Sequence, residues 1–203
     1  MNAARAILAL TLSVTVSLPG AAVANSLRAK GAAAQVAGSA LSVTPPRDWN
    51  RLSMRPGKRS ETWTLDGEQL NDVTFYAGIE PDQPLVRERK KKSDPLPRFT
   101  ATTLLAEVPE LLERTYRTVR GTGSFTTTGV SPEPFLGSTG VRFTYEYADD
   151  DNLTRKGEGR AALIGGKLYM ATFDAPRLHY YDRSLSDFRA LADSAKLGKV
   201  AGK

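Results

Sequence analysis

The stretch TGVRFTYEYADD, residues 139–150, decides the fold class. Apolar and aromatic side chains alternate with polar ones along it, which predicts a β-strand that buries one face. One face carries Val141, Phe143, Tyr145 and Tyr147, and the other carries Arg142, Thr144 and Glu146. The polar run DDDN that follows, residues 149–152, is typical of a solvated turn, because it lacks the spacing of a calcium-binding loop.

Further strands are predicted on both sides of this one. After it, segments 153–164 and 167–175 are separated by two glycines, which predict a tight turn. Before it, strands rich in β-branched and aromatic residues are predicted within 40–53, 60–67, 71–79 and 123–137. Strands that follow one another through tight turns pair antiparallel, so we predict an antiparallel meander.

Two segments have helical periodicity instead. In TATTLLAEVPELLERTYRTV, residues 100–119, apolar side chains repeat at helical spacing. Pro109 either kinks one helix or begins the second of two, because proline is tolerated only in a first turn. SLSDFRALADSAK, residues 184–196, predicts a last helix, with Ser184 as its N-cap and Asp187 completing a capping box. This order of strands and helices predicts an α+β fold with helices packed on the sheet.

The two ends of the chain are expected to lie outside the fold. Residues 1–24 combine a positive start, an apolar stretch and an A-x-A motif, which is the layout of a secretory signal. Cleavage between Ala24 and Asn25 would release a protein of the periplasm or of the extracellular space, and the apolar stretch is too short to span a membrane. We expect a flexible tether at 25–39, one domain at 40–197 and a disordered tail at 198–203.

Residue composition excludes several classes of site. The chain has no cysteine, which excludes disulfides, thiolate nucleophiles and iron–sulfur clusters. It has one histidine, so we expect no zinc or copper centre. His179 falls between an expected strand and an expected helix, and no G-x-S-x-G motif supplies a nucleophile for it, so we interpret it as a solvated residue of that connection. No glycine-rich loop has phosphate-binding spacing, and we expect no cofactor.

Most of the net charge of +6 comes from the run RERKKK, residues 87–92. It belongs to a proline-rich segment, residues 80–97, that predicts a long exposed loop. Such a loop would attract an acidic protein, anionic lipid or acidic glycan, whereas nucleic acid is not expected because the run contains no aromatic residue. The candidate binding residues are its five cations, Arg87, Arg89, Lys90, Lys91 and Lys92. The alternative is a loop that is only solvated.

The sequence also resembles a known fold family. A Pro46-x-x-Trp49 step follows the first expected strand, and the chain closes with LYMATFDAP and then YYDRSLSDFRALADSAK. These features resemble the PsbP-like fold family, which includes the extrinsic oxygen-evolving subunit of photosystem II and the Ran-binding release factors of the Mog type. The resemblance covers about residues 40–197 and implies an α/β/α sandwich with a binding or assembly role. Metal binding in the photosynthetic members uses histidines, and this chain has one, so we do not expect it here.

Together these features predict an exported, non-catalytic binding or assembly factor that contacts an anionic partner through the basic loop. One alternative is a hydrolase or lyase that uses carboxylates such as Glu158 or Asp174 in a cleft, because two carboxylates can do acid–base chemistry without histidine. Another alternative is a structural protein of the cell envelope, with the loop held at lipid headgroups.

Overall fold

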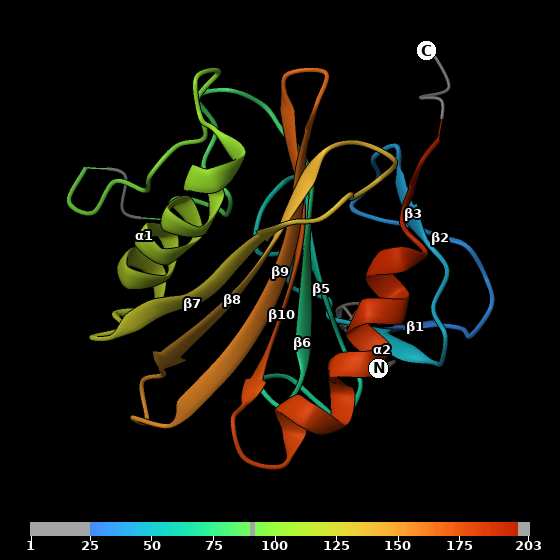
Figure 1. The fold of residues 1–203 in the computed structure, drawn as a ribbon. Coiled ribbons are helices and arrows are strands. Elements are labelled where there is room, and N and C mark those ends of the chain that lie inside the picture. The colour runs from blue at the N-terminus through green and yellow to red at the C-terminus, as the bar shows by residue number, and fades with distance from the viewer. Residues whose placement is uncertain (1–24, 90–91, 199–203) are drawn as a thin grey trace, which may run out of the picture.

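An eight-stranded antiparallel sheet forms the centre of the molecule (Figure 1). The structure, a computed structural model, describes residues 25–89 and 92–198. In spatial order the strands are β1 (Ser26–Arg28), β4 (Trp49–Arg51), β5 (Ser60–Thr64), β6 (Asp72–Ile79), β10 (Lys167–Pro176), β9 (Thr154–Ile164), β8 (Gly140–Ala148) and β7 (Phe125–Pro132). The predicted antiparallel meander is confirmed from β7 to β10, where each strand pairs with the next along the chain.

One helix covers each face of this sheet (Figure 1). On one face lies α1 (Val108–Arg120), preceded by the 3-10 turn η1 (Leu105–Glu107). On the other lies α2 (Tyr180–Asp193), beside a small sheet of β2 (Ala34–Gln35), β3 (Leu41–Val43) and β11 (Lys196–Leu197). The predicted α+β class is therefore confirmed, as an α/β/α sandwich. None of the helices in the described part of the chain is long and apolar enough to cross a membrane.

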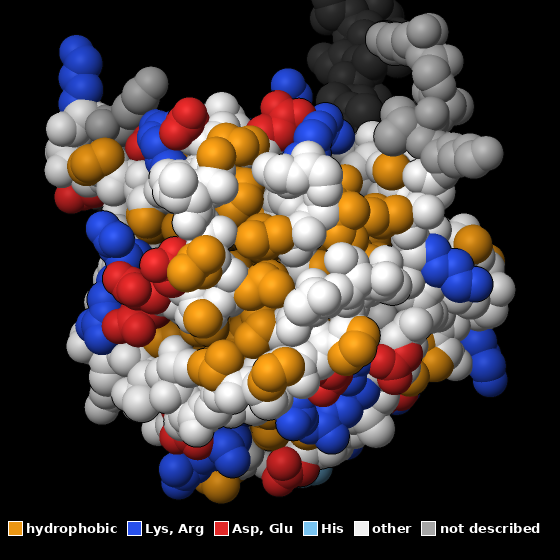
Figure 2. Space-filling model, turned by 45° about the horizontal axis from the view of Figure 1, so that its top comes forward, with side chains coloured by type: hydrophobic (Ala, Val, Ile, Leu, Met, Phe, Trp, Pro, Cys, Tyr) orange, Lys and Arg blue, Asp and Glu red, His pale blue; other side chains and the backbone are white. Residues whose placement is uncertain are grey.

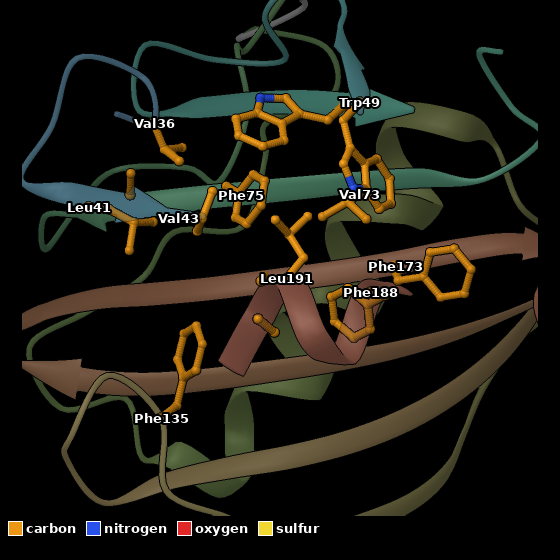
Figure 3. Close-up of a cluster of buried hydrophobic side chains, with 14 of the residues drawn as sticks. Val36, Leu41, Val43, Trp49, Val73, Phe75, Phe135, Phe173, Phe188 and Leu191 are labelled. Atoms are coloured by element: carbon orange, nitrogen blue, oxygen red, sulfur yellow. The ribbon is translucent and has the colours of Figure 1, made fainter. Parts of the chain in front are cut away.

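Alternation along the strands separates two cores. Between the sheet and α2, Val73 and Phe75 of β6 and Phe173 of β10 pack against Phe188 and Leu191 of the helix (Figure 3). The other core lies between the sheet and α1. It contains the residues of β6 and β10 whose side chains point to that face, together with the aromatic face of β8. Because successive side chains of a strand point to opposite faces, both sides of β6 and β10 are buried.

The expected tether at 25–39 is wrong, because this segment is part of the fold. β1 pairs antiparallel with β4, and Val36 is fully buried in the α2-side core. The backbone N–H of Ala37 donates to the buried carboxylate of Glu61 at 3.0 Å. Backbone pairing and one buried valine hold a segment whose composition alone is too polar and small to predict order. The expected signal at residues 1–24 lies outside the described residues.

The structure settles where each helix begins and how the described end of the chain is held. Pro109 occupies the first turn of α1, so it begins that helix after η1 and does not kink it. The expected N-cap at Ser184 is wrong, because α2 begins at Tyr180. Ser184 is buried inside the helix, where its hydroxyl accepts a hydrogen bond from Asn71 at 3.3 Å. Of the expected tail at 198–203, the described part is Gly198, whose N–H donates to the carbonyl of Ala40 at 2.9 Å.

Candidate functional site

A cleft of about 600 Å³ lies on the α1 side of the sheet. One wall is the C-terminal half of α1, and the opposite wall is the connection between β4 and β5. The loop that contains the basic run closes a third side. The floor consists of side chains from β5 and β6, namely Thr62, Asp72, Thr74 and Tyr76. These residues alternate with Trp63, Val73 and Phe75, which enter the opposite core, so the strand period itself aims them into the cleft.

Four arginines from three separate segments line the cleft: Arg55, Arg87, Arg89 and Arg120. The basic loop is fixed against the opposite wall, because the N–H of Arg87 donates to the carbonyl of Pro56 at 2.7 Å. Glu88 folds the loop on itself, since its carboxylate accepts hydrogen bonds from the N–H of Leu96 and from Arg98. The loop is therefore positioned by specific contacts and presents its cations toward one concavity.

The structure brings two of the five predicted binding residues, Arg87 and Arg89, into the cleft. Lys92 is exposed farther along the loop, and residues 90–91 lie outside the described part of the chain. Sequence reasoning missed Arg55 and Arg120, which lie outside the basic run. Tertiary structure alone brings them to the same place as the basic loop.

Asp72 is the buried acidic residue of the floor. This residue is 6% exposed and lines the cleft. Oδ2 accepts the N–H of Gln69 at 3.0 Å, whereas Oδ1 is buried and accepts no hydrogen bond from any described residue. Burial raises the pKa of Asp72 to about 7, and the carboxylate of Asp174, its direct cross-strand neighbour, adds to the shift. The floor thus contains an acceptor that is unsatisfied and titrates near neutral pH.

Beneath the floor, Asp174 is the centre of a closed polar network. Its carboxylate accepts hydrogen bonds from Arg155 at 2.9 and 3.0 Å, from Tyr147 at 2.7 Å and from Tyr116 at 3.0 Å. Burial alone would raise the pKa of Asp174, but Arg120, Arg155 and these hydrogen bonds outweigh it and hold the pKa below its usual value. The guanidinium of Arg120 links this network to the cleft, since it lies 4.8 Å from the ring centre of Tyr116 and donates to Tyr147. 

The carboxylates that sequence analysis offered for catalysis are bound elsewhere. Glu158 is fully buried on the α2 side, where Arg189 donates to it at 2.6 Å and Arg142 lies at 3.8 Å. Neither it nor Asp174 is among the described residues that line the cleft. The placement of these two residues in a cleft is therefore wrong, because arginines within the fold already neutralise both.

The two remaining candidate sites from the sequence, His179 and the run at 149–152, are parts of the fold's connections. His179 is exposed at the start of α2 in a left-handed conformation, with φ of 72°, and lies 3.3 Å from Arg183. The polar run at 149–152 is a turn, in which the carboxylate of Asp149 accepts hydrogen bonds from the N–H groups of Asp151 and Leu153. Within the described ranges, no group of three or more His, Asp or Glu side chains is arranged to hold a metal ion.

A second exposed surface lies at the end of the sandwich that carries the β9–β10 turn. Apolar side chains gather across the middle of this face, and charged side chains lie mainly around its margin (Figure 2). In the cleft, by contrast, charged and apolar side chains line the same concavity. A concave site with convergent polar groups is the stronger candidate for specific binding.

Comparison with known proteins identifies the fold. Models of known protein families and curated protein sequences give no match. Among solved structures, CyanoP, the cyanobacterial PsbP of Synechocystis, aligns over 90% of this chain and 98% of its own, with a TM-score of 0.54 and 13% identity. The chain has the PsbP-like fold. Mog1, studied as a point mutant, aligns with a TM-score of 0.47 and 10% identity over 84% of this chain and 97% of its own. LpqN of Mycobacterium tuberculosis aligns with a TM-score of 0.35 and 9% identity over 85% and 83%. 

Asp72 makes the stability of the PsbP-like domain depend on pH. Its folded pKa of about 7 lies above the unfolded value of 3.8, so ionisation favours the unfolded chain increasingly between these two values. We expect Asp72→Asn to be more stable than the wild type by about 2–4 kcal/mol at pH 8, with the difference vanishing below pH ~4. Urea unfolding from pH 4 to pH 8 measures it, with the exposed Asp150→Asn as control. A difference that does not grow with pH would contradict the assignment.

Proposed function

We propose that the protein is an exported, non-catalytic binding module that receives an acidic segment of a partner protein in the cleft. The observation that supports this most directly is the convergence of Arg55, Arg87, Arg89 and Arg120 on one concavity. Guanidinium groups bind carboxylates in bidentate geometry, and they do so more strongly where side chains exclude part of the solvent. Lys92 and the neighbouring residues of the run, Lys90 and Lys91, extend the positive potential along the same loop.

A protein segment fits this cleft better than a lipid headgroup or a glycan does. The lining mixes cations with apolar side chains, and two of these are strongly exposed: Met54 by 72% and Val119 by 54%. Exposed apolar residues beside arginines are typical of protein-binding surfaces, where an apolar anchor and a charged rim act together. A bare headgroup or sugar would leave Met54 and Val119 in water.

A catalytic role has less support than a binding role. Asp174 and Glu158 are neutralised by arginines that belong to the fold. Asp72 is the carboxylate that the sheet places on the cleft floor, and acid–base cleavage by paired carboxylates needs a second group opposite it. Glu68 and Asp94 line the cleft from other segments, the connection between β5 and β6 and the basic loop.

Binding is tested with an acetylated and amidated octapeptide of alternating Glu and Leu, and with its Gln–Leu counterpart. We expect the acidic peptide to bind, and the variant Arg55→Ser/Arg87→Ser/Arg89→Ser to weaken its Kd by about 10- to 100-fold, since each lost charge contact contributes about 0.5–1 kcal/mol. Isothermal titration at 50 and 200 mM salt measures the Kd and its salt dependence.

The matched control removes three arginines outside the cleft: Arg47, Arg114 and Arg177, each changed to Ser. We expect it to bind like the wild type, because the net charge is equal but the cleft is intact. Equal weakening in both triple variants, or equal binding of the Gln–Leu peptide, would contradict a specific acidic-segment site. Tight binding to vesicles with phosphatidylglycerol, without binding to the acidic peptide, would assign the cleft to lipid instead.

A further inference from the structure

The proposed cleft contains one group that an acidic ligand does not explain. Asp72 lies on the floor of the cleft that the arginines line, and its own negative charge would repel a carboxylate. Oδ2 is fixed by the N–H of Gln69, which leaves the buried Oδ1 as the atom without a hydrogen bond from the described residues. A buried acceptor without a donor costs about 1–3 kcal/mol, so a ligand that supplied a donor would recover this free energy.

The charges around Asp72 indicate which kind of donor fits. Its cross-strand neighbour Asp174 is on β10, Arg155 is on β9 and Arg120 is at the end of α1, and all three act electrostatically on the Asp72 carboxyl. With both carboxylates ionised, this group of four has no net charge. An incoming ammonium would add an unbalanced cation beside Arg120, whereas an uncharged donor leaves the balance unchanged. An uncharged donor also stabilises the ionised carboxylate, which burial alone disfavours.

We infer that Oδ1 of Asp72 accepts a hydrogen bond from an uncharged donor on the bound segment, so that the cleft selects an acidic segment carrying a side-chain amide or hydroxyl between its acidic residues. The inference rests on the proposed function. In this arrangement Arg87 and Arg89 of the basic loop receive carboxylates, and the floor selects the residue between them. A site built to accept a donor discriminates against a ligand that lacks it, because the acceptor is then buried unpaired.

The test uses acetylated and amidated pentapeptides Glu-Glu-X-Glu-Glu, in which X is Gln, Met or Lys. Gln and Met have similar length, but only Gln carries an amide donor. For the wild type at pH 7.5 we expect Gln to bind about 10-fold or more tightly than Met, which corresponds to the hydrogen bond of an uncharged donor to a charged acceptor. Lys should bind no more tightly than Gln.

Two variants separate recognition by Asp72 from a change of shape. In Asp72→Ala the acceptor is removed, and we expect Gln and Met peptides to bind equally. In Asp72→Asn the side-chain carbonyl keeps the bond to the N–H of Gln69, so the amide NH₂ takes the place of Oδ1 and turns an acceptor into a donor. A fourth peptide with X as methionine sulfoxide, which only accepts, should then gain affinity relative to the wild type.

The outcomes distinguish the inference from the proposed function. Equal binding of Gln and Met peptides to the wild type overturns the inference, and so does a Gln preference that survives in Asp72→Ala. If the Lys peptide binds most tightly, the inference that the donor is uncharged is wrong. If any of these occurs while Arg55→Ser/Arg87→Ser/Arg89→Ser still weakens every peptide, the proposed function stands alone. If no acidic peptide binds the wild type, both fail.

Discussion

Replacing Asp174 by alanine is expected to lower the free energy of unfolding by about 3–5 kcal/mol. The carboxylate is buried and accepts hydrogen bonds from Arg155, Tyr147 and Tyr116. Without it, the guanidinium of Arg155 keeps the carbonyl of Gln69 at 2.6 Å and the more distant carboxylate of Asp149 at 3.9 Å. A buried cation that loses its main counter-ion carries most of the penalty, because the fold excludes the water that would otherwise solvate it.

The measurement is urea unfolding at pH 7.5, with Glu110→Ala as the control. Glu110 also faces an arginine, Arg114 at 3.9 Å, but both side chains are about two-thirds exposed, and such a pair contributes at most about 0.5 kcal/mol. A loss below ~1 kcal/mol for Asp174→Ala would show that the network does not stabilise the fold. A variant that folds normally would also reopen a functional reading of this carboxylate.

Asp72 modifies the expected loss. Removing the charge of Asp174 lowers the pKa of Asp72, since Asp174 is one of the two causes that raise it. Asp72 is then more completely ionised at pH 7.5, and its negative charge partly balances Arg155. Combining Asp174→Ala with Asp72→Asn removes this compensation, so we expect the double variant to lose more stability than the two single changes predict together.

The layers of the fold could be predicted from sequence, because they depend on local periodicity. The alternation from Val141 to Tyr147 predicted β8 and its buried aromatic face, and all four of these residues are buried. A helix within 100–119 was predicted from apolar spacing, and α1 spans Val108–Arg120, although sequence could not decide the role of Pro109. Both signals are read within one element and do not depend on what packs against it.

The elements that sequence missed are held by distant contacts. β1 pairs through its backbone with β4, and its three residues have no periodicity that would indicate a strand. The start of α2 is also set by packing, since the ring of Tyr181 stacks on Phe173 at 5.6 Å and draws the helix back from Ser184. The start of α2 therefore follows the contact between Tyr181 and Phe173, which the sequence could not reveal, and not the capping preference of Ser184.

The site, like the fold, could be predicted only in part from the sequence. The charge of the basic loop could be recognised from its composition, and Arg87 and Arg89 line the cleft. The cleft itself could not, because its walls come from α1, the β4–β5 connection and the loop. Asp72 looks like an ordinary acidic residue at the start of a strand, and only its burial and its cross-strand pairing with Asp174 distinguish it.

Substituting Gly159 by alanine is expected to destabilise the protein by about 3 kcal/mol, through steric conflict and not through loss of charge. Gly159 on β9 is the cross-strand partner of Phe143 on β8, and the far end of the Phe143 ring occupies the space where a Cβ at Gly159 would lie. A Cβ at Gly159 would be 2.2 Å from that ring, well inside any real contact distance. The ring is buried in the core on the α1 side of the sheet, so it cannot move without displacing the side chains packed around it.

A smaller side chain opposite should rescue this change, which distinguishes a steric cause from a general weakening of β9. We expect Phe143→Ala alone to cost about 3–5 kcal/mol, and Gly159→Ala to cost much less in that background, because the added methyl group then occupies space that the ring has left. Gly123→Ala is the control, since an added Cβ there meets nothing within 4 Å. Additive losses in the double variant would contradict the steric explanation. A positive coupling would show that residue 159 must be glycine because the Phe143 ring occupies the space that a side chain would need.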